Sequence, residues 1–297
     1  MLIVGAGDIG RRVIAQTRRH DQVFAATSTP SKRSGLRRCG AIPILADLDR
    51  PGTLKRLPHD WDALIHAAPP QSYLTRDIRT RNLLRATRPG NTSARVVVYL
   101  STSGVYGDCR GARITEAHAV NPRNARAKRR THAERALIRA ARRGAFRLAI
   151  LRVPGIYAAD RLPLARLKAG TPALLSAEDV YTNHIHAADL ASLTRAALQR
   201  MRRRVRPRVR IYHASDDSVL KMGDYFDLVA DAFGLARPPR LPRAQVAATV
   251  SPMLLSFMSE SRLLDNTRMK RELGVTLQFP TAADGVRAAA RLTLSQA

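Results

Sequence analysis

The sequence predicts an α/β protein with a doubly wound parallel sheet, and two observations lead to this prediction. Short apolar runs typical of strands alternate with amphipathic runs typical of helices as far as Val153. The first apolar run, Leu2 to Val4, passes directly into the glycine-rich turn from Gly5 to Gly10. Strand and helix in alternation indicate a parallel sheet covered by helices on both faces. Ligands of such sheets bind at the carboxyl ends of the strands.

The individual elements follow from apolar periodicity and from the residues that begin and end each run. Six strands are expected at residues 2–4, 22–26, 42–46, 63–66, 95–101 and 147–153. Helices between them are expected at about 10–19, 73–88 and 124–143, the last ended by Gly144. After Pro154 the pattern loosens, with helices expected at 189–202 and 223–233, a last strand at 209–213 and an amphipathic helix at about 244–258.

The turn Gly5-Ala6-Gly7-Asp8-Ile9-Gly10 fits the G-x-G-x-x-G fingerprint of dinucleotide-binding Rossmann domains. The first glycine permits a tight turn, the second lets the backbone approach a pyrophosphate, and the third allows a helix to pack closely on the strand. The helix that begins here directs free N–H groups at the phosphates. We therefore expect a Rossmann-like NAD(P)-binding domain over residues 1–155. A smaller, mostly helical substrate part is expected over 156–297, with residues 180–216 packing back onto the first domain.

The end of the second strand bears on the choice between NAD and NADP. NAD-binding domains usually carry a carboxylate about 20 residues after the turn, where it holds the ribose 2′-hydroxyl. Here the residues from Ala26 to Arg33 contain no carboxylate. Hydroxyl groups and two cations stand there instead, and Ser28, Lys32 and Arg33 could hold a 2′-phosphate. The sequence favours NADP, with NAD as the alternative and with solvated loop charges as the structural alternative.

Composition limits the classes of protein. The chain has 297 residues, and no apolar run approaches the roughly 20 residues of a membrane-spanning helix. The start of the chain does not resemble a signal peptide. Cys39 and Cys109 are too few for a disulfide framework or a complete metal cage. We expect a cytoplasmic protein with no membrane association.

The charge is the unusual feature of the composition. The 51 basic residues exceed the 23 acidic ones, which leaves a formal net charge of +28, and 45 of the basic residues are arginine. Such a charge can mark a nucleic-acid partner, but an arginine bias can also follow genome base composition. The basic stretches 123–143 and 200–210 have no interleaved aromatic residues, and no helix-turn-helix or zinc signature accompanies them. The sequence argues against a nucleic-acid partner, although the charge keeps that alternative open.

Five stretches together resemble the extended, atypical short-chain dehydrogenase/reductase superfamily, and within it the NAD-dependent epimerase/dehydratase-like proteins. They are the glycine turn, Ala46-Asp47-Leu48, His66-Ala67-Ala68-Pro69-Pro70, Leu100 to Gly107 (LSTSGVYG), and Leu151 to Tyr157 (LRVPGIY) with the later Asn183 to Leu190 (NHIHAADL). The resemblance implies that the chain binds NAD(P). The implied cofactor-binding residues are Gly5, Ala6, Gly7, Asp8, Ile9, Gly10, Ser28, Lys32, Arg33, Asp47, Leu48, Ala67, Ala68, Pro69, Thr102, Pro154 and Ile156.

The chain departs from the family where the family has its catalytic residues. Val4 stands where the usual glycine motif has another glycine. More seriously, the family's Tyr-x-x-x-Lys dyad is replaced by Arg126 and Arg130, counted back from Glu134. An arginine cannot exchange a proton near neutral pH. The two arginines could instead hold cofactor or an anionic substrate, or only add charge to the helix. Thr102 matches the family's catalytic Ser/Thr, and Tyr106, Tyr157, Tyr181 or a bound water could donate the proton.

The histidine pair in the later part of the chain does not change this prediction. His184 and His186 share one strand face, but without a third ligand they predict no metal site. The predicted function is hydride transfer with NAD(P) on a small or sugar-like hydroxyl or carbonyl compound, in an oxidoreductase or epimerase with an atypical active site. The alternative is a non-catalytic NAD(P)-binding sensor or regulator that has lost the dyad, possibly associated with nucleic acid. A homodimer, formed through the segment 244–258, is a further alternative to core packing.

Overall fold

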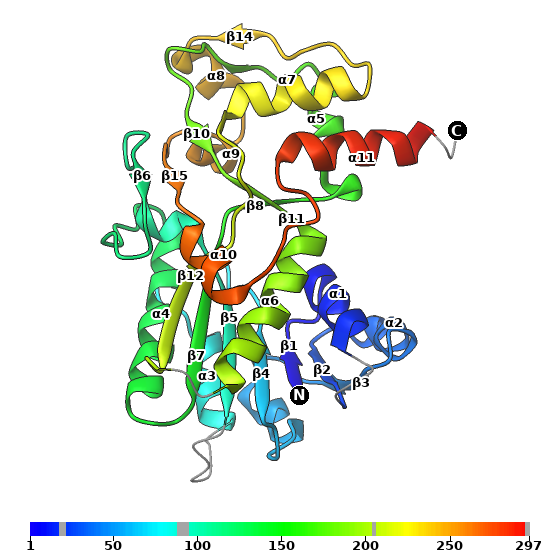
Figure 1. The fold of residues 1–297 in the computed structure, drawn as a ribbon, viewed down its shortest axis with the longest axis vertical. Coiled ribbons are helices and arrows are strands. Elements are labelled where there is room, and N and C mark those ends of the chain that lie inside the picture. Colours follow the sequence, from blue (N-terminus) through cyan, green and yellow to red (C-terminus); the bar gives the residue numbers. More distant parts are fainter. Residues whose placement is uncertain (18–21, 88–94, 204–205, 295–297) are drawn as a thin grey trace.

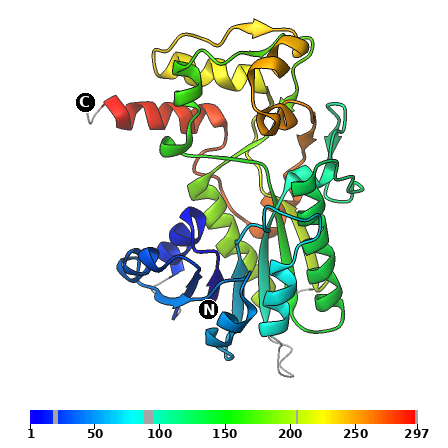
Figure 2. The same ribbon diagram turned by 180° about the vertical axis from the view of Figure 1, so that it is seen from behind.

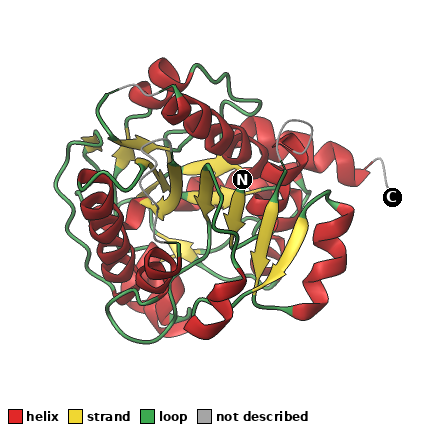
Figure 3. Cartoon of the chain, turned by 90° about the horizontal axis from the view of Figure 1, so that it is seen from below, coloured by secondary structure: helices red, strands yellow, loops and turns green. Residues whose placement is uncertain are grey.

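The computed structural model describes residues 1–17, 22–87, 95–203 and 206–294, and its centre is a seven-stranded parallel sheet (Figures 1 and 3). The strand order is β12-β7-β5-β4-β1-β2-β3. Their bounds are β1 Leu2–Val4, β2 Phe24–Thr27, β3 Ile42–Leu45, β4 Ala63–His66, β5 Val96–Thr102, β7 Arg147–Val153 and β12 Val209–His213. From β1 the chain proceeds outward through β2 and β3. It then returns to the other side of β1 and proceeds outward through β4, β5, β7 and β12, so the switch point lies between β1 and β4. That switch point is where doubly wound sheets bind ligands.

Helices cover both faces of the sheet because alternate strand residues face opposite sides. One apolar cluster joins Ile3 and Val98 to α1 (Asp8–Thr17), α2 (Arg33–Arg38) and α6 (Ala187–Arg202). The other cluster joins Leu2 and Val97 to α3 (Arg79–Ala86) and α4 (Ala125–Arg142). The expected Rossmann-like α/β architecture is thus confirmed.

The C-terminal part forms a smaller unit beyond the carboxyl ends of the strands (Figures 1 and 2). Its helices are α5 Leu164–Lys168, α7 Met222–Ala232, α8 Arg243–Thr249, α9 Pro252–Phe257 and α11 Ala282–Leu294. Four short strand pairs accompany them: β8 (Gly155–Tyr157) with β11 (His184–His186), β9 (Ala173–Leu174) with β14 (Arg240–Leu241), β10 (Tyr181–Thr182) with β13 (Leu220–Lys221), and β6 (Arg113–Ile114) with β15 (Leu263–Leu264). Between these segments the chain returns to the sheet, where α6 packs on α1 and β12 pairs with β7, and α10 (Thr267–Leu273) packs on α6 and β12.

The helix expected at 73–88 was wrong in its first turn and a half, since α3 begins at Arg79. The preceding residues form a loop around Gln71, whose buried side chain donates to the Arg76 carbonyl and accepts from the Ile78 N–H. Leu74 adopts a left-handed conformation with φ of 64°. A buried amide that pairs with the backbone keeps this segment out of a helix. Residue 88 lies outside the described residues.

The single helix expected at 244–258 was also wrong. The segment forms α8 and α9, separated at Val250 and Ser251. Pro252 lacks the N–H that a continuing helix needs, and the Ser251 hydroxyl accepts from the Leu254 N–H as a new N-cap. Elsewhere the boundaries shift by one or two residues: α1 begins at Asp8 and β2 at Phe24, while 18 and 19 lie outside the described residues. Among the residues described, no helix is both long and apolar enough to cross a membrane.

Candidate functional site

The glycine turn needs each of its glycines for a different reason. Gly5 has φ of +87°, and a Cβ there would lie 2.3 Å from the backbone nitrogen of Ala68. A Cβ on Gly10 would lie 3.2 Å from the Gly5 carbonyl oxygen, so α1 packs closely on β1. By contrast, nothing lies within 4 Å of the position that a Cβ would take on Gly7. Gly7 therefore presents bare backbone to open space at the beginning of α1, as a pyrophosphate site requires.

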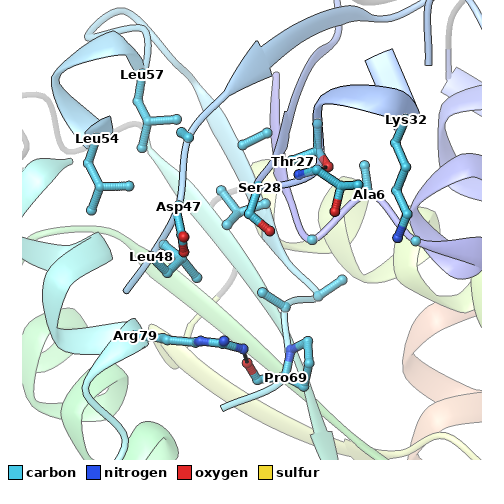
Figure 4. Close-up of a pocket in the computed structure, with 18 residues that line it drawn as sticks. Ala6, Thr27, Ser28, Lys32, Asp47, Leu48, Leu54, Leu57, Pro69 and Arg79 are labelled. Carbon is cyan, nitrogen blue, oxygen red and sulfur yellow. Dashed lines mark hydrogen bonds between the residues drawn. The ribbon is translucent and has the colours of Figure 1, made fainter. Parts of the chain in front are cut away.

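That space is a pocket of about 320 Å³ at the carboxyl ends of β1, β2, β3 and β4 (Figure 4). Ten of the residues expected at the cofactor line it: Gly5, Ala6, Gly7, Ser28, Lys32, Asp47, Leu48, Ala67, Ala68 and Pro69. Four strand ends that are separate in the sequence thus meet at one cavity. Its position is the switch point of the sheet, where α1 begins.

The β2 side of the pocket bears hydroxyl groups and one cation. Thr27, Ser28, Thr29 and Lys32 line it, and none of the residues from Ala26 to Arg33 is acidic. The Lys32 ammonium makes no ion pair with any described residue, whereas Arg33, also exposed, is not part of the lining. The structure thus places Lys32 at the pocket and Arg33 outside its lining, a difference that the sequence does not reveal.

The opposite wall is held by an ion pair that the sequence did not predict. Arg79 donates from Nε to Asp49 Oδ1 at 2.9 Å and from Nη2 to Asp49 Oδ2 at 2.6 Å. Its Nη1 donates to the Pro69 carbonyl at 3.0 Å. The hydrogen bond from Arg79 lowers the pKa of the Asp49 carboxyl. Arg79 thus ties the loop after β3 to the loop after β4, and both loops line the pocket.

Asp47 is fixed by its own loop. Its Oδ1 accepts from the Asp49 N–H at 2.9 Å, which is an Asx turn, and its N–H donates to the Thr53 hydroxyl. Leu48, Leu54 and Leu57 lie beside it and give this end of the pocket an apolar surface (Figure 4). An apolar slot with one carboxylate at its rim suits a flat heterocycle that carries an amino group.

The remaining expected cofactor residues lie outside this pocket. Asp8, Ile9 and Gly10 form the first turn of α1, and the Ile9 side chain packs in the core, so only their backbone faces the pocket's end of the helix. Asp8 pairs with Arg12 and with Arg161 of the C-terminal part, at 3.0 and 3.1 Å. Thr102, Pro154 and Ile156 belong to the ends of β5 and β7 and to β8, farther along the same edge of the sheet.

The two arginines at the dyad positions have separate environments. Arg130 donates from Nη1 to the Leu100 carbonyl at 2.8 Å and to the Tyr99 hydroxyl at 3.1 Å, so it is attached to β5. Arg126, one turn earlier, is exposed and stacks on the ring of Phe257 in α9, with 4.2 Å between Cζ and the ring centroid. One arginine therefore holds helix to strand, and the other joins α4 to the C-terminal part.

Thr102 and Tyr106 differ in what their hydroxyl groups can do. Thr102 Oγ1 accepts from the Gly104 N–H at 3.2 Å, which leaves its own proton free. Tyr106 is buried, and its hydroxyl accepts from Arg152 Nη1 at 2.6 Å. It also lies 2.6 Å from His213 Nε2. Burial raises the pKa of Tyr106 to about 12.

The direction of these hydrogen bonds follows from the tautomer of His213. Its Nδ1 lies 2.9 Å from the carbonyl oxygen of Asp265, which can only accept, so Nδ1 carries the proton. Nε2 is then an acceptor and Tyr106 donates to it. Arg152 also pairs with buried Glu134 at 2.8 Å, and Glu134 accepts from the Ser101 hydroxyl. This network uses the Tyr106 hydroxyl proton in the bond to His213 and joins β5, α4, β7 and β12.

Tyr157, one of the two other candidate tyrosines, and the histidine pair have packing roles in the structure. Tyr157 is buried and donates to the Thr281 carbonyl at 3.1 Å. His184 stacks on Tyr225 at 4.1 Å between ring centroids, and His186 packs on Phe279 at 4.0 Å. Burial lowers the pKa of each histidine to about 4. Within the described part of the chain, no three His, Cys, Asp or Glu side chains lie together as metal ligands.

Comparisons with known proteins place this fold. The model of the NAD dependent epimerase/dehydratase family matches residues 1–212. A conserved protein of unknown function from Silicibacter pomeroyi is 26% identical, with a TM-score of 0.78 over 98% of this chain and 97% of that chain. A UDP-glucose 4-epimerase from Thermotoga maritima, solved with UDP-glucose, is 16% identical, with a TM-score of 0.78 over 99% and 98%.

A UDP-glucose 4-epimerase from Stenotrophomonas maltophila, solved with NAD and formylated UDP-arabinopyranose, is 18% identical, with a TM-score of 0.76 over 100% and 99% of the two chains. The last two likenesses concern the fold alone. No curated protein sequence matches the chain. The family match covers most of the chain and includes the glycine turn and all strands of the central sheet except the last residue of β12. The chain therefore belongs to the NAD dependent epimerase/dehydratase family.

Proposed function

We propose that the chain binds NADP in preference to NAD in the pocket at the ends of β1 to β4, and that it transfers hydride to or from a small or sugar-like hydroxyl or carbonyl compound. The bare backbone at Gly7, open toward the pocket where α1 begins, is the observation that supports this most. A pyrophosphate would meet free N–H groups and the positive end of the helix there. Family membership supports the nicotinamide cofactor, and the epimerases above suggest UDP-sugars as the first substrates to try.

The pocket residues fit the other parts of a dinucleotide. Leu48, Leu54 and Leu57 offer an apolar surface to the adenine, and the Asp47 carboxylate can accept from its amino group. Ser28, Thr29 and Lys32, which forms no ion pair with a described residue, suit a 2′-phosphate, since hydroxyl and ammonium groups donate to its oxygens. A carboxylate there would instead repel the phosphate. The bound nicotinamide would supply the hydride for the reaction.

The chain's own groups must handle the substrate oxygen. Thr102 is the proposed hydrogen-bond donor, because its oxygen already accepts from the Gly104 N–H while its proton is unused. Arg126 and Arg130 are proposed to bind an anionic group rather than to exchange protons, because arginine is a poor acid–base catalyst. A water held beside Thr102 would then exchange the proton with solvent.

The second candidate is an NAD(P)-binding regulator without turnover. The observation that favours it is that two groups at the ends of β5 and β7 are already engaged. Arg130 donates to the Leu100 carbonyl and the Tyr99 hydroxyl, and the Tyr106 hydroxyl proton is used in the bond to His213. Turnover of any UDP-sugar or small carbonyl compound with bound nicotinamide favours the enzyme. Tight binding without turnover, with a partner whose affinity depends on the redox state of the nicotinamide, favours the regulator.

The experiment is a calorimetric titration of the full chain with NADPH, NADP, NADH and NAD. We expect binding at one site per chain and a preference for the phosphorylated pair. In the Gly7→Leu variant the side chain enters open space, so the fold should persist while affinity falls at least 100-fold. The matched control is Gly52→Leu, since a Cβ on Gly52 also meets nothing within 4 Å and Gly52 does not line the pocket. Equal binding by both variants would refute the site.

A further inference from the structure

The positive charge of the chain is concentrated in three stretches that fold as neighbours. Residues 63–107, 117–159 and 190–215 contain 25 lysines and arginines but only two carboxylates. The rest of the chain contains 26 basic and 21 acidic residues, so it is close to balanced. The three stretches include β5, β7 and β12 at one end of the sheet, α3 and α4 on one face of it and α6 on the other face (Figure 1). A bias of arginine over lysine does not explain why acidic residues are so few in these stretches; the first turn of α6 adds one more carboxylate, Asp189, which is buried.

The two carboxylates in these stretches do not reach the surface. Asp77 is 2% exposed and accepts from the Thr80 N–H. Glu134 is 2% exposed and pairs with Arg152. The surface that α3 and α4 present to solvent therefore has cations without neighbouring acids from the same elements.

We call this surface the α3–α4 arginine face and define it by Arg76, Arg81, Arg85, Arg135, Arg139 and Arg142. All six side chains are exposed, and none forms an ion pair with a described residue. Four of them line a groove of about 310 Å³ between the two helices: Arg76, Arg81, Arg85 and Arg139. On the other side of α4 a groove of about 560 Å³ toward β12 adds Arg208 beside Arg142. The basic stretches 123–143 and 200–210, distant in sequence, thus meet here.

The spacing of the cations along α4 arranges them in a row. Lys128, Arg135, Arg139 and Arg142 fall at intervals of seven, four and three residues, which places them on one stripe of the helix. At a rise of 1.5 Å per residue the stripe is about 21 Å long. An extended row of cations suits an extended polyanion, because a compact anion would meet only one or two of them.

We propose that the α3–α4 arginine face binds the phosphate backbone of a nucleic-acid duplex. Among the described residues the exposed phenylalanine and tyrosine side chains are Tyr73, in the loop before α3 three residues ahead of Arg76, and Phe257 in α9. One ring beside the face does not form the row of rings on which successive bases of a single strand stack. No large apolar side chain of these two helices is exposed either, although an amphipathic protein helix would need such anchors. A symmetric second copy would set arginines against arginines. With these partners argued against, the phosphate backbone of a duplex is the partner that matches a row of cations.

The test is fluorescence anisotropy of a labelled duplex DNA of mixed sequence, about 20 base pairs long, titrated with the full chain at several salt concentrations. The face variant is R81Q/R85Q/R139Q. The control variant is R37Q/R38Q/R291Q, which removes the same charge from exposed arginines of α2 and α11 that have no ion pair to a described residue. Urea unfolding and NADPH binding of both variants check that the fold and the strand-end pocket are intact.

We expect the face variant to bind at least tenfold more weakly, with a slope of log K against log salt that is smaller by about 2 to 3. The control variant should lose less than about threefold. Equal weakening of both variants would show that net charge alone drives binding and would overturn the proposal. It would also fail if the wild type showed no salt-dependent binding, or if poly-L-glutamate competed as well as duplex DNA at equal charge.

Discussion

The carboxyl ends of β1 to β4 and the carboxyl ends of β5 and β7 lie along one edge of the same sheet, but their polar groups are used differently. At β1 to β4 the groups are available: Gly7 is bare, Lys32 is unpaired among the described residues, and the pocket is open. At β5 and β7 they are mostly engaged with each other, as in the network of Glu134, Arg152 and Tyr106. The carboxyl ends of one parallel sheet can thus leave polar groups open at some strands and join them into a buried network at others.

The largest expected effect tests whether the network at β5 and β7 is structural. Glu134→Ala leaves Arg152 as a buried, uncompensated charge and should lower the free energy of unfolding by about 3–5 kcal/mol. Urea unfolding measures it. The double variant Glu134→Met with Arg152→Met removes both charges and should recover most of the loss. A loss below about 1 kcal/mol for Glu134→Ala would contradict a structural role.

The next largest effect is on cofactor affinity, and it distinguishes two cations after β2, Lys32 and Arg33. Lys32→Ala should weaken NADPH binding about tenfold and leave NADH binding unchanged, because only NADPH has the 2′-phosphate. Arg33→Ala, which removes an exposed cation outside the pocket lining, should change either affinity less than about twofold. Calorimetry gives both values. If Arg33→Ala had the larger effect, the 2′-phosphate would lie outside the pocket.

The smallest effect concerns the pair of Asp49 and Arg79. Because the pKa of Asp49 is lowered in the folded protein, the pair stabilises the fold above the unfolded-state pKa of about 4 and loses this contribution as pH falls through the folded-state pKa. Asp49→Asn should therefore cost up to about 1 kcal/mol at pH 7 and less near pH 2.

Urea unfolding at the two pH values measures this difference. The matched control is Asp60→Asn, because Asp60 is an exposed carboxylate that pairs with no described residue. A cost for Asp49→Asn that stayed constant between pH 7 and pH 2 would show that the ion pair is not its source.

The sheet and the glycine turn could be predicted because their signals are local. Apolar runs such as Val96 to Leu100 and the spacing of Gly5, Gly7 and Gly10 are visible without knowledge of distant residues. Ten predicted residues meet at the pocket for the same reason, since parallel strands end at one edge. The apolar spacing of residues 246–257 predicts one continuous helix, and only the proline at position 252 marks in the sequence the break between α8 and α9.

Arg79 and the loop before it could not be predicted. Arg79 is one of 45 arginines, and only its distance from Asp49 and Pro69 in the fold distinguishes it. The loop depends on Gln71, a residue usually exposed, whose burial comes from tertiary packing. The same holds for Arg126 and Arg130, which look alike on a helix but contact different parts of the molecule.

Hydrogen exchange of the full chain with and without saturating NADPH tests most directly whether the open groups at the ends of β1 to β4 form the cofactor site. The account predicts slower exchange in the segments that line the pocket: 4–10, 27–32, 46–48 and 67–69. We expect no change over 81–86 or 135–142, which do not line the pocket, although these arginine-rich segments could attract the anion. Protection confined to α3 and α4, with unchanged exchange at the glycine turn, would contradict it and show that NADPH binds by charge alone.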